Sequence, residues 1–170
     1  MPSRFFKHAA LVLCTGFVSV GCVTPGGNGT AQGFRDQYLV SRAALESGDY
    51  TRAIRGYNRL MDMSGPLQPR IRLELAHTLL RNGDYRQAAD EARILAATET
   101  GTARSAALAV QGTAEHELAL IAMDRGQGET RIRGLLISAQ TAMSEVLQND
   151  PDLDPLDALQ ARLNQISALL

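Results

Sequence analysis

One short segment of the chain occurs twice, and this repeat constrains the fold more than any other feature of the sequence. The run SGDYTRAI from Ser47 to Ile54 returns 35 residues later as NGDYRQAA from Asn82 to Ala89. A fixed period of this length is typical of chains built from similar helical or strand units, each of which buries its apolar face against the next unit. The repeat therefore predicts successive stacked units.

The repeated segment resembles the junction between the two helices of a tetratricopeptide repeat (TPR), and this resemblance implies a role for each of its residues. Glycine tolerates the left-handed backbone that ends a helix, and the aspartate after it can cap the next helix, while the tyrosine packs over the junction. An alanine three residues after the tyrosine suits a close crossing of two helices, where a larger side chain would separate them. These positions are Gly48, Tyr50 and Ala53 in the first copy and Gly83, Tyr85 and Ala88 in the second.

In the tetratricopeptide repeat, a Gly-Asp-Tyr turn of this kind joins helix A to helix B. The resemblance implies an all-α fold of helical hairpins stacked as a short right-handed solenoid. Composition agrees, because Trp is absent and aromatic residues make up only 5% of the chain, which favours helices packed on small side chains.

Beyond the two repeats, the apolar spacing predicts a third, lengthened hairpin and a last helix. A long helix is expected over 102–123, and a second amphipathic helix is expected to follow Gly128 and to end near Asn149. Asp154 and Pro155 predict the N-cap and first position of a C-terminal helix. We expect this helix to cap the end of the solenoid.

The N-terminus has the pattern of a targeting segment. A basic start with Arg4 and Lys7 precedes an apolar stretch over 9–20, which is too short to span a bilayer, and then Cys22. The segment VSVGC resembles the bacterial lipobox, which implies cleavage before Cys22 and acylation of its thiol. A plain secretory signal cleaved near Gly21, or an uncleaved anchor, is the alternative.

Three regions are therefore expected along the chain. They are a lipoprotein signal peptide over 1–21, a flexible Gly-rich membrane tether over 22–33 and a TPR-like helical domain over 34–170. Val23 follows the cysteine where an Asp would act as an inner-membrane retention signal in enteric bacteria. The resemblance thus implies a lipid-anchored envelope protein at the outer membrane, facing the periplasm.

The resemblance also implies a concave face lined by the A helices, and TPR domains commonly bind other proteins there. With four arginines over an apolar floor, this groove is expected to be basic and to suit a partner segment that carries carboxylates. The alternative is an ordinary solvated face. The groove residues are Arg35, Tyr38, Arg42, Leu45 and Glu46 from the first repeat and Arg70, Leu73, His77, Leu80 and Arg81 from the second.

Other chemistry has little support in the sequence. Removing the first 21 residues leaves 15 arginines, spread along the chain, against 18 acidic residues, so a nucleic-acid partner is not expected. His77 and His116 lie on different expected helices and lack the second ligand of a helical zinc site, so each is interpreted as a surface or groove histidine. We expect no cofactor, no metal, no small-molecule substrate and no enzymatic activity.

The expected function is that of a membrane-anchored periplasmic TPR-type scaffold, which mediates protein–protein interaction during assembly of an envelope, pilus or secretion complex. Its partners would be another envelope protein or peptide segment and, through the N-terminal lipid, the membrane. TPR lipoproteins of Tad-type pilus assembly are among the proteins that it resembles. The alternative is an accessory subunit of a periplasmic enzyme, or such an enzyme itself.

Overall fold

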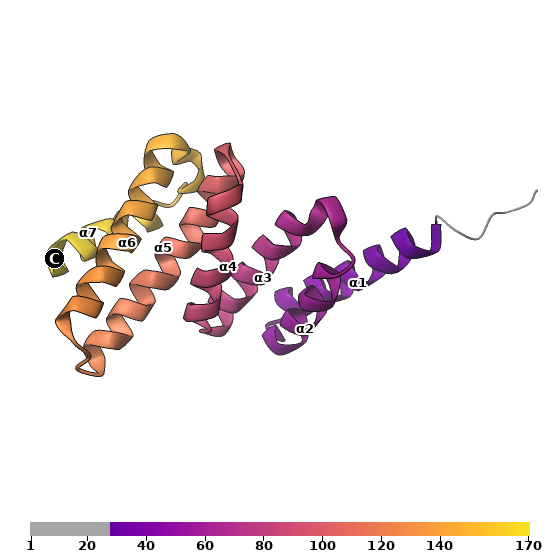
Figure 1. The fold of residues 1–170 in the computed structure, drawn as a ribbon, viewed down its shortest axis with the longest axis horizontal. Helices are drawn as coiled ribbons and strands as arrows, with labels where there is room; N and C mark the ends of the chain where they lie inside the picture. The colour runs from indigo at the N-terminus through magenta and orange to yellow at the C-terminus, as the bar shows by residue number, and fades with distance from the viewer. Residues whose placement is uncertain (1–27) are drawn as a thin grey trace, which may run out of the picture.

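The computed structural model describes residues 28–170, and this part of the chain is built from helices without any strand. The expected all-α fold is therefore confirmed. Seven α-helices and two short 3-10 helices follow one another along the chain (Figure 1). They are α1 (Asn28–Glu46), α2 (Tyr50–Met61), η1 (Gly65–Leu67), α3 (Gln68–Asn82), α4 (Tyr85–Thr98), α5 (Gly101–Asp124), α6 (Glu129–Asn149), η2 (Pro151–Leu153) and α7 (Ala158–Leu169).

The helices are arranged in space in the order of the sequence. Each α-helix packs against the next, and α3 also contacts α5 while α5 contacts α7. Figure 1 shows the result as an elongated row, with α1 and α2 at one end and α6 and α7 at the other. The long helices expected over 102–123 and after Gly128 are present as α5 and α6, which pack along each other. None of the helices within residues 28–170 is both long and apolar enough to cross a bilayer.

The two repeated turns have the expected backbone. Gly48 and Gly83 both adopt the left-handed region, with φ of 82° and 83°, and end α1 and α3. A residue with a Cβ would be strained at either position. Ala53 and Ala88 are completely buried, as the helix crossing requires. Both turns and both buried alanines therefore lie at the positions that the repeated segment predicts.

The start of α1 corrects the expected tether. Residues 28–33 were expected to be flexible, but they form the first turns of α1, which begins at Asn28. A glycine in a helix costs only about 1 kcal/mol relative to alanine, so Gly29 and Gly33 weaken this segment without stopping it. Gln32 Nε2 also donates a hydrogen bond to Asp36 Oδ1, one turn later, at 3.4 Å.

The remaining N-terminal expectations cannot be compared with this structure. The signal peptide over 1–21, the lipidation site Cys22 and the tether over 22–27 lie outside the described residues.

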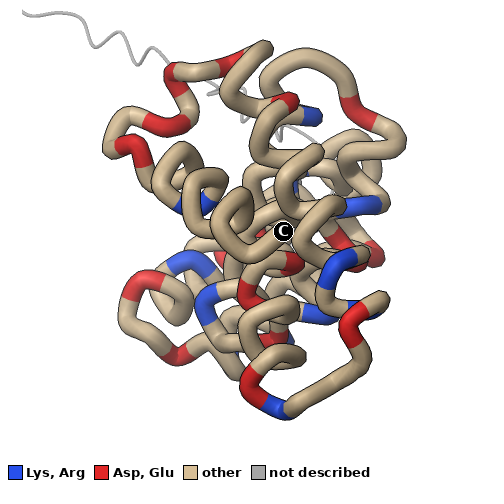
Figure 2. Tube along the Cα trace, turned by 90° about the vertical axis from the view of Figure 1, so that its left-hand side faces the viewer, with Lys and Arg blue, Asp and Glu red and all other residues tan. Residues whose placement is uncertain are grey.

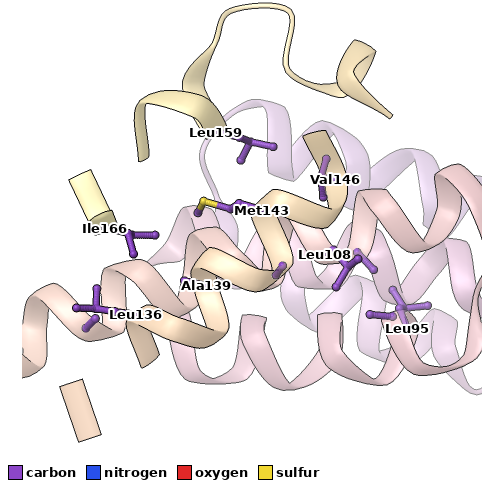
Figure 3. Packing of buried hydrophobic residues seen from close by; sticks show 12 residues of the cluster. Leu95, Leu108, Leu136, Ala139, Met143, Val146, Leu159 and Ile166 are labelled. Carbon is purple, nitrogen blue, oxygen red and sulfur yellow. The ribbon is translucent and has the colours of Figure 1, made fainter. Parts of the chain in front are cut away.

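Buried apolar side chains form two main clusters along the row of helices. The first joins α1 to α4 and includes Tyr57, Leu60 and Ile71. The second runs from α4 to α7 and includes Met143 and Ile166. Figure 3 shows Met143 of α6 on the side of Leu159 and Ile166, so α7 seals the apolar face of the α5–α6 pair.

Two glycines allow close helix approaches within these clusters. A Cβ built on Gly56 of α2 would lie 2.1 Å from Ser41 Oγ of α1. A Cβ built on Gly112 of α5 would lie 2.8 Å from Met143 Cγ and 3.2 Å from the carbonyl oxygen of Ala139, both on α6. Each position therefore requires the smallest residue where two backbones approach.

The last helix begins later than expected. We expected Pro155 at its first position, but α7 begins at Ala158, after Asp157 in a left-handed conformation with φ of 55°. Asp154 nevertheless caps the helix, because its carboxylate accepts hydrogen bonds from the amides of Leu159 and Gln160 at 3.0 Å. Burial alone would raise the pKa of Asp154, but these amide hydrogen bonds outweigh it and hold the pKa below its usual value.

Candidate functional site: a groove between α1 and α3

A groove of about 790 Å³ opens between α1 and α3 and extends to the junction of α4 and α5. Residues three or four apart share one side of a helix, so α1 and α3 each present several side chains to it. Six of the expected groove residues line this space. They are Arg42 and Leu45 of α1 and Arg70, Leu73, His77 and Arg81 of α3.

The other expected groove residues are placed elsewhere. Arg35 and Tyr38 line a separate hollow of about 200 Å³, which they share with Arg70. Leu80 is half-buried and packs against the core rather than lining the groove. Glu46 is exposed and engages Arg42, at a salt-bridge distance of 2.8 Å.

Arg42 is held by two ion pairs and is not a free cation. Its Nε lies 2.8 Å from Glu46 Oε1, and its Nη1 donates to both carboxylate oxygens of Glu74 at 3.1 and 3.2 Å. The Glu46 hydrogen bond and the Glu74 charge raise the pKa of Arg42 further above its usual range. Tyr38 Oη donates to the same Glu74 carboxylate at 3.2 Å. Arg42 and Tyr38 therefore bind α1 to α3 through one carboxylate.

Glu74 was not among the predicted groove residues, although its spacing along α3 places it on the groove side. It lies four residues after Arg70 and three before His77, which places it on the same side of α3. Glu99, at the end of α4, also lines the groove. Two glutamates therefore accompany the three arginines of the groove, so its positive charge is smaller than expected. Figure 2, which views the molecule from its C-terminal end, shows basic and acidic residues interspersed along the chain.

Two cations remain for an anionic ligand in the groove. Within residues 28–170, neither Arg70 nor Arg81 forms an ion pair. The guanidinium carbon of Arg81 lies 5.3 Å from the ring centroid of Tyr50, which fixes its position by a cation–π contact. Arg70 and Arg81 are eleven residues apart on α3, or about 16 Å along the helix axis. Leu45, Leu73 and Leu95 provide apolar surface between them.

His77 lies between these two arginines and faces the groove. His77 is exposed at the surface of the groove, and partial desolvation of its ring is the main cause that lowers its pKa. The Glu74 charge opposes this shift, whereas the charges of Arg42 and Arg81 add to it. The ring is therefore neutral at pH 7 and has one donor and one acceptor nitrogen. Such a ring suits a hydrogen bond to a polar group of a ligand and adds no charge to the groove.

His116 is not a surface histidine, and the expectation for it is wrong. Its side chain is completely buried, and its Nδ1 lies 3.2 Å from Arg162 Nη1 of α7. The same Arg162 nitrogen donates to Glu117 Oε1 at 2.7 Å. Burial is the main cause that lowers the pKa of His116, so the ring is neutral inside the fold. The triad joins α5 to α7 as part of the packing.

Metal ligands do not gather anywhere in the described part of the chain, where no group of three or more His, Cys, Asp or Glu side chains could hold an ion. Comparison with protein families, with curated proteins and with solved structures finds no match for this chain. The function is therefore inferred from the residues and their geometry.

Proposed function

We propose that the protein is a lipid-anchored scaffold of the bacterial cell envelope, whose TPR-like hairpins bind a segment of a partner protein in the groove between α1 and α3. The observation that carries this proposal is the groove itself, with apolar surface between Arg70 and Arg81 at the two ends of α3. A peptide segment with apolar side chains between two carboxylates would complement this arrangement, because guanidinium groups bind carboxylates through paired hydrogen bonds.

The TPR-like part of the proposal is supported by packing as well as by the repeated turns. The pairs α1–α2 and α3–α4 are joined by the two Gly-Asp-Tyr turns, and α3 contacts α5 in addition to its neighbours in sequence. Contacts between alternate helices are what a stack of A and B helices produces. In this arrangement α1, α3 and α5 are the A helices, and α7 caps the last pair.

The anchor belongs to the same proposal and is supported by the sequence. Cleavage before Cys22 would leave a lipid-modified cysteine a few residues before α1, with the glycines at positions 26 and 27 between them. More than one acyl chain gives durable anchoring, whereas a single chain gives marginal binding. The groove would then stand close to the periplasmic face of the outer membrane.

Charge reversal tests the groove. The double variant Arg70→Glu/Arg81→Glu should lose partner recovery in pull-downs from detergent-solubilised envelope, while its melting temperature changes little, since exposed charges contribute little to stability. Added salt should weaken wild-type binding, because the screening length is about 8 Å at physiological ionic strength. Arg42 is left unchanged in this variant, because it holds α1 to α3.

The matched control is Arg55→Glu/Arg59→Glu, which makes the same charge change at exposed positions of α2 outside the groove. Equal recovery of every partner by the two double variants would show that the groove is an ordinary solvated face.

Mass spectrometry of the membrane-extracted protein tests the anchor. We expect an N-terminus at Cys22 that carries acyl chains, and Cys22→Ser should release the domain from the membrane or stall the precursor. The mature protein should also resist amine-directed labels, since Lys7 is the only lysine of the chain. Recovery of the unmodified wild-type chain as soluble periplasmic protein would reject lipidation.

A further inference from the structure

The two Gly-Asp-Tyr turns differ in how they cap the helices that follow them. In the first turn, the Asp49 carboxylate accepts a hydrogen bond from the backbone amide of Arg52 at 3.1 Å and caps α2. In the second turn, Asp84 Oδ2 instead accepts a hydrogen bond from Asn82 Nδ2 at 2.7 Å, and no side chain caps α4. The expectation that Asp84 caps its helix is therefore wrong, and the first amides of α4 are left open.

Asn82 explains the difference between the turns. The first copy has Ser47 at this position, and its hydroxyl donates to the carbonyl oxygen of Ala44 rather than to the aspartate. The longer amide of Asn82 reaches forward to Asp84 and holds its carboxylate away from the helix start. One substitution between otherwise similar turns thus opens the N-terminus of α4.

A hollow of about 440 Å³ lies at this open N-terminus. The turn and the first residues of α4, over 83–87, form one side of it, and the end of α5 and the start of α6 form the other. It shares no lining residue with the groove between α1 and α3. The lining includes the arginines Arg86, Arg125 and Arg131, the carboxylate of Asp84 and the apolar side chains Leu118 and Ile121.

The three arginines give the hollow a positive charge. Within residues 28–170, none of them forms an ion pair, and all three side chains are exposed. Asp84 is the only acidic residue among the lining residues, and Asn82 already engages it. A second helix, α6, also begins here, with Gly128 as its N-cap and with Glu129, which does not line the hollow, in its first turn. Open amides and the positive end of a helix dipole favour an anion at such a place.

The arrangement favours a tetrahedral anion over a carboxylate. The guanidinium groups come from three segments, which are the start of α4, the end of α5 and the start of α6. A planar carboxylate is satisfied by one or two guanidinium forks, whereas a phosphate group has oxygens in several directions and a larger negative charge. Donors that line one hollow from three segments therefore match phosphate better.

We propose that the hollow between the α3–α4 turn and the α5–α6 turn is a binding site for a phosphate group, carried either by a soluble phosphate ester or by an anionic lipid headgroup. Arg86, Arg125 and Arg131 pair with its oxygens, and the open amides of α4 donate to it. This site is independent of the partner groove and does not depend on the proposed scaffold function.

Hydrogen exchange on the whole protein in neutral detergent tests the site. Inorganic phosphate, titrated at constant ionic strength with chloride as the other salt, should slow exchange of the amides over 83–87. Arg86→Gln/Arg125→Gln should weaken phosphate binding about tenfold or more, since a hydrogen bond to a charged group contributes enough free energy for such a change. The matched control is Arg52→Gln, in the first turn of the capped helix α2, which should bind phosphate like the wild type.

Asn82→Ser provides a second test that leaves every arginine in place. It reproduces the first turn, so Asp84 should become free to cap α4 and should compete with the anion. Phosphate binding should weaken, while the melting temperature should stay the same or rise because the helix gains a cap. A purely structural role of Asn82 would instead lower the melting temperature and leave phosphate binding unchanged, which would contradict the proposal.

Two further arms identify the source of the phosphate. Glycerol 3-phosphate in solution represents a soluble ester. Nanodiscs that contain phosphatidylglycerol represent a lipid headgroup, and nanodiscs of phosphatidylcholine alone are their control. Slower hydrogen exchange over 83–87 with either probe supports the proposal and identifies the source. No protection by any phosphate compound, or protection by a glutamate-rich peptide alone, would overturn it.

Discussion

Two helix pairs each have a glycine where their helices cross. In the α1–α2 pair, Gly56 of α2 faces Ser41 of α1, whereas in the α5–α6 pair the glycine is Gly112 of α5. The first pair surrounds its crossing with apolar and aromatic side chains, and the Tyr38 and Tyr57 rings meet edge-on with centroids 6.3 Å apart. The α5–α6 pair instead buries a carboxylate and an imidazole, because Glu115 and His116 of α5 are almost completely enclosed.

The difference follows from the number of neighbours that each helix has. The helix α1 lies at the end of the row, so its charged residues reach solvent or the groove. The helix α5 contacts α3, α4, α6 and α7, and leaves its polar residues little access to water. Each buried charge must therefore find a partner on a neighbouring helix, as Glu115 finds Arg93 on α4 at 2.8 Å. A helix in the middle of such a row is held by polar pairs as well as by apolar packing.

The largest expected effect removes the partner of the buried Glu115 carboxylate on α5. Arg93→Leu leaves the Glu115 carboxylate, which is 2% exposed, with only the hydrogen bond from Gln111 at 3.2 Å. Removing the half-exposed arginine leaves a buried charge without its main partner, so thermal or urea unfolding should show a loss of about 2 to 3 kcal/mol. Arg93→Leu/Glu115→Leu should recover most of this loss, because neither charge remains.

Asp90→Asn is the control for this pair. Asp90 is exposed and contacts the same arginine at 2.8 Å, so its loss should cost less than about 1 kcal/mol. If Asp90→Asn and Arg93→Leu lowered the free energy of unfolding by similar amounts, the buried Glu115 charge would not distinguish the α5–α6 pair from the α1–α2 pair.

The next effect compares the two glycines at the helix crossings. Gly56→Ala should destabilise the protein by about 1 to 3 kcal/mol, because the new Cβ meets Ser41 Oγ and Cβ, which are fixed close to the backbone of α1. Gly112→Ala should cost less, since its nearest contact is the flexible side chain of Met143. Urea unfolding of both variants measures the difference.

A size swap checks the cause of the Gly56 effect. Ser41→Gly removes both contacting atoms, so Ser41→Gly/Gly56→Ala should be more stable than Gly56→Ala alone. If the swap restores nothing, or if Gly112→Ala costs more than Gly56→Ala, the first crossing is not the tighter one.

The sequence was sufficient for features that local rules determine. The turns at Gly48 and Gly83, the burial of Ala53 and Ala88 and the long helix α5 follow from a repeated motif and a regular apolar spacing. Those signals are contained in neighbouring residues, and the structure agrees with them.

Features that depend on packing partners could not be predicted in the same way. Glu115 and His116 are polar residues in a helix with an apolar face, and only the position of α5 among four other helices explains why they are buried. The groove shows the same limit, because the pairing of Arg42 with Glu74 joins residues 32 positions apart. A repeat pattern predicts on which side of a helix each residue lies, but it does not predict the ion pairs between helices.

The smallest expected effect is a pH dependence of the melting temperature. It has contributions from His116, which is buried in the α5–α6 pair, and from His77, which lies in the groove. The pKa values of His116 and His77 are both lowered in the fold, below the value of about 6.5 for an unfolded chain. As the pH falls through 6.5, the unfolded chain takes up protons that the folded protein does not bind, so stability should decrease. The melting temperature should therefore be lower at pH 5.5 than at pH 7.5.

Single substitutions divide this pH dependence between the two regions. His116→Gln should reduce the difference in melting temperature between pH 5.5 and 7.5, because it removes a ring that is buried beside the Arg162 cation. His77→Gln should reduce it as well, and the remaining difference in the double variant should be small. Carboxylates whose pKa values are lowered, such as Asp154 and Glu145, lose their contribution only at more acidic pH, so they do not obscure this window. An undiminished difference in the double variant would mean that neither histidine is held neutral by its surroundings, and the enclosed environment assigned to α5 would then be wrong at His116.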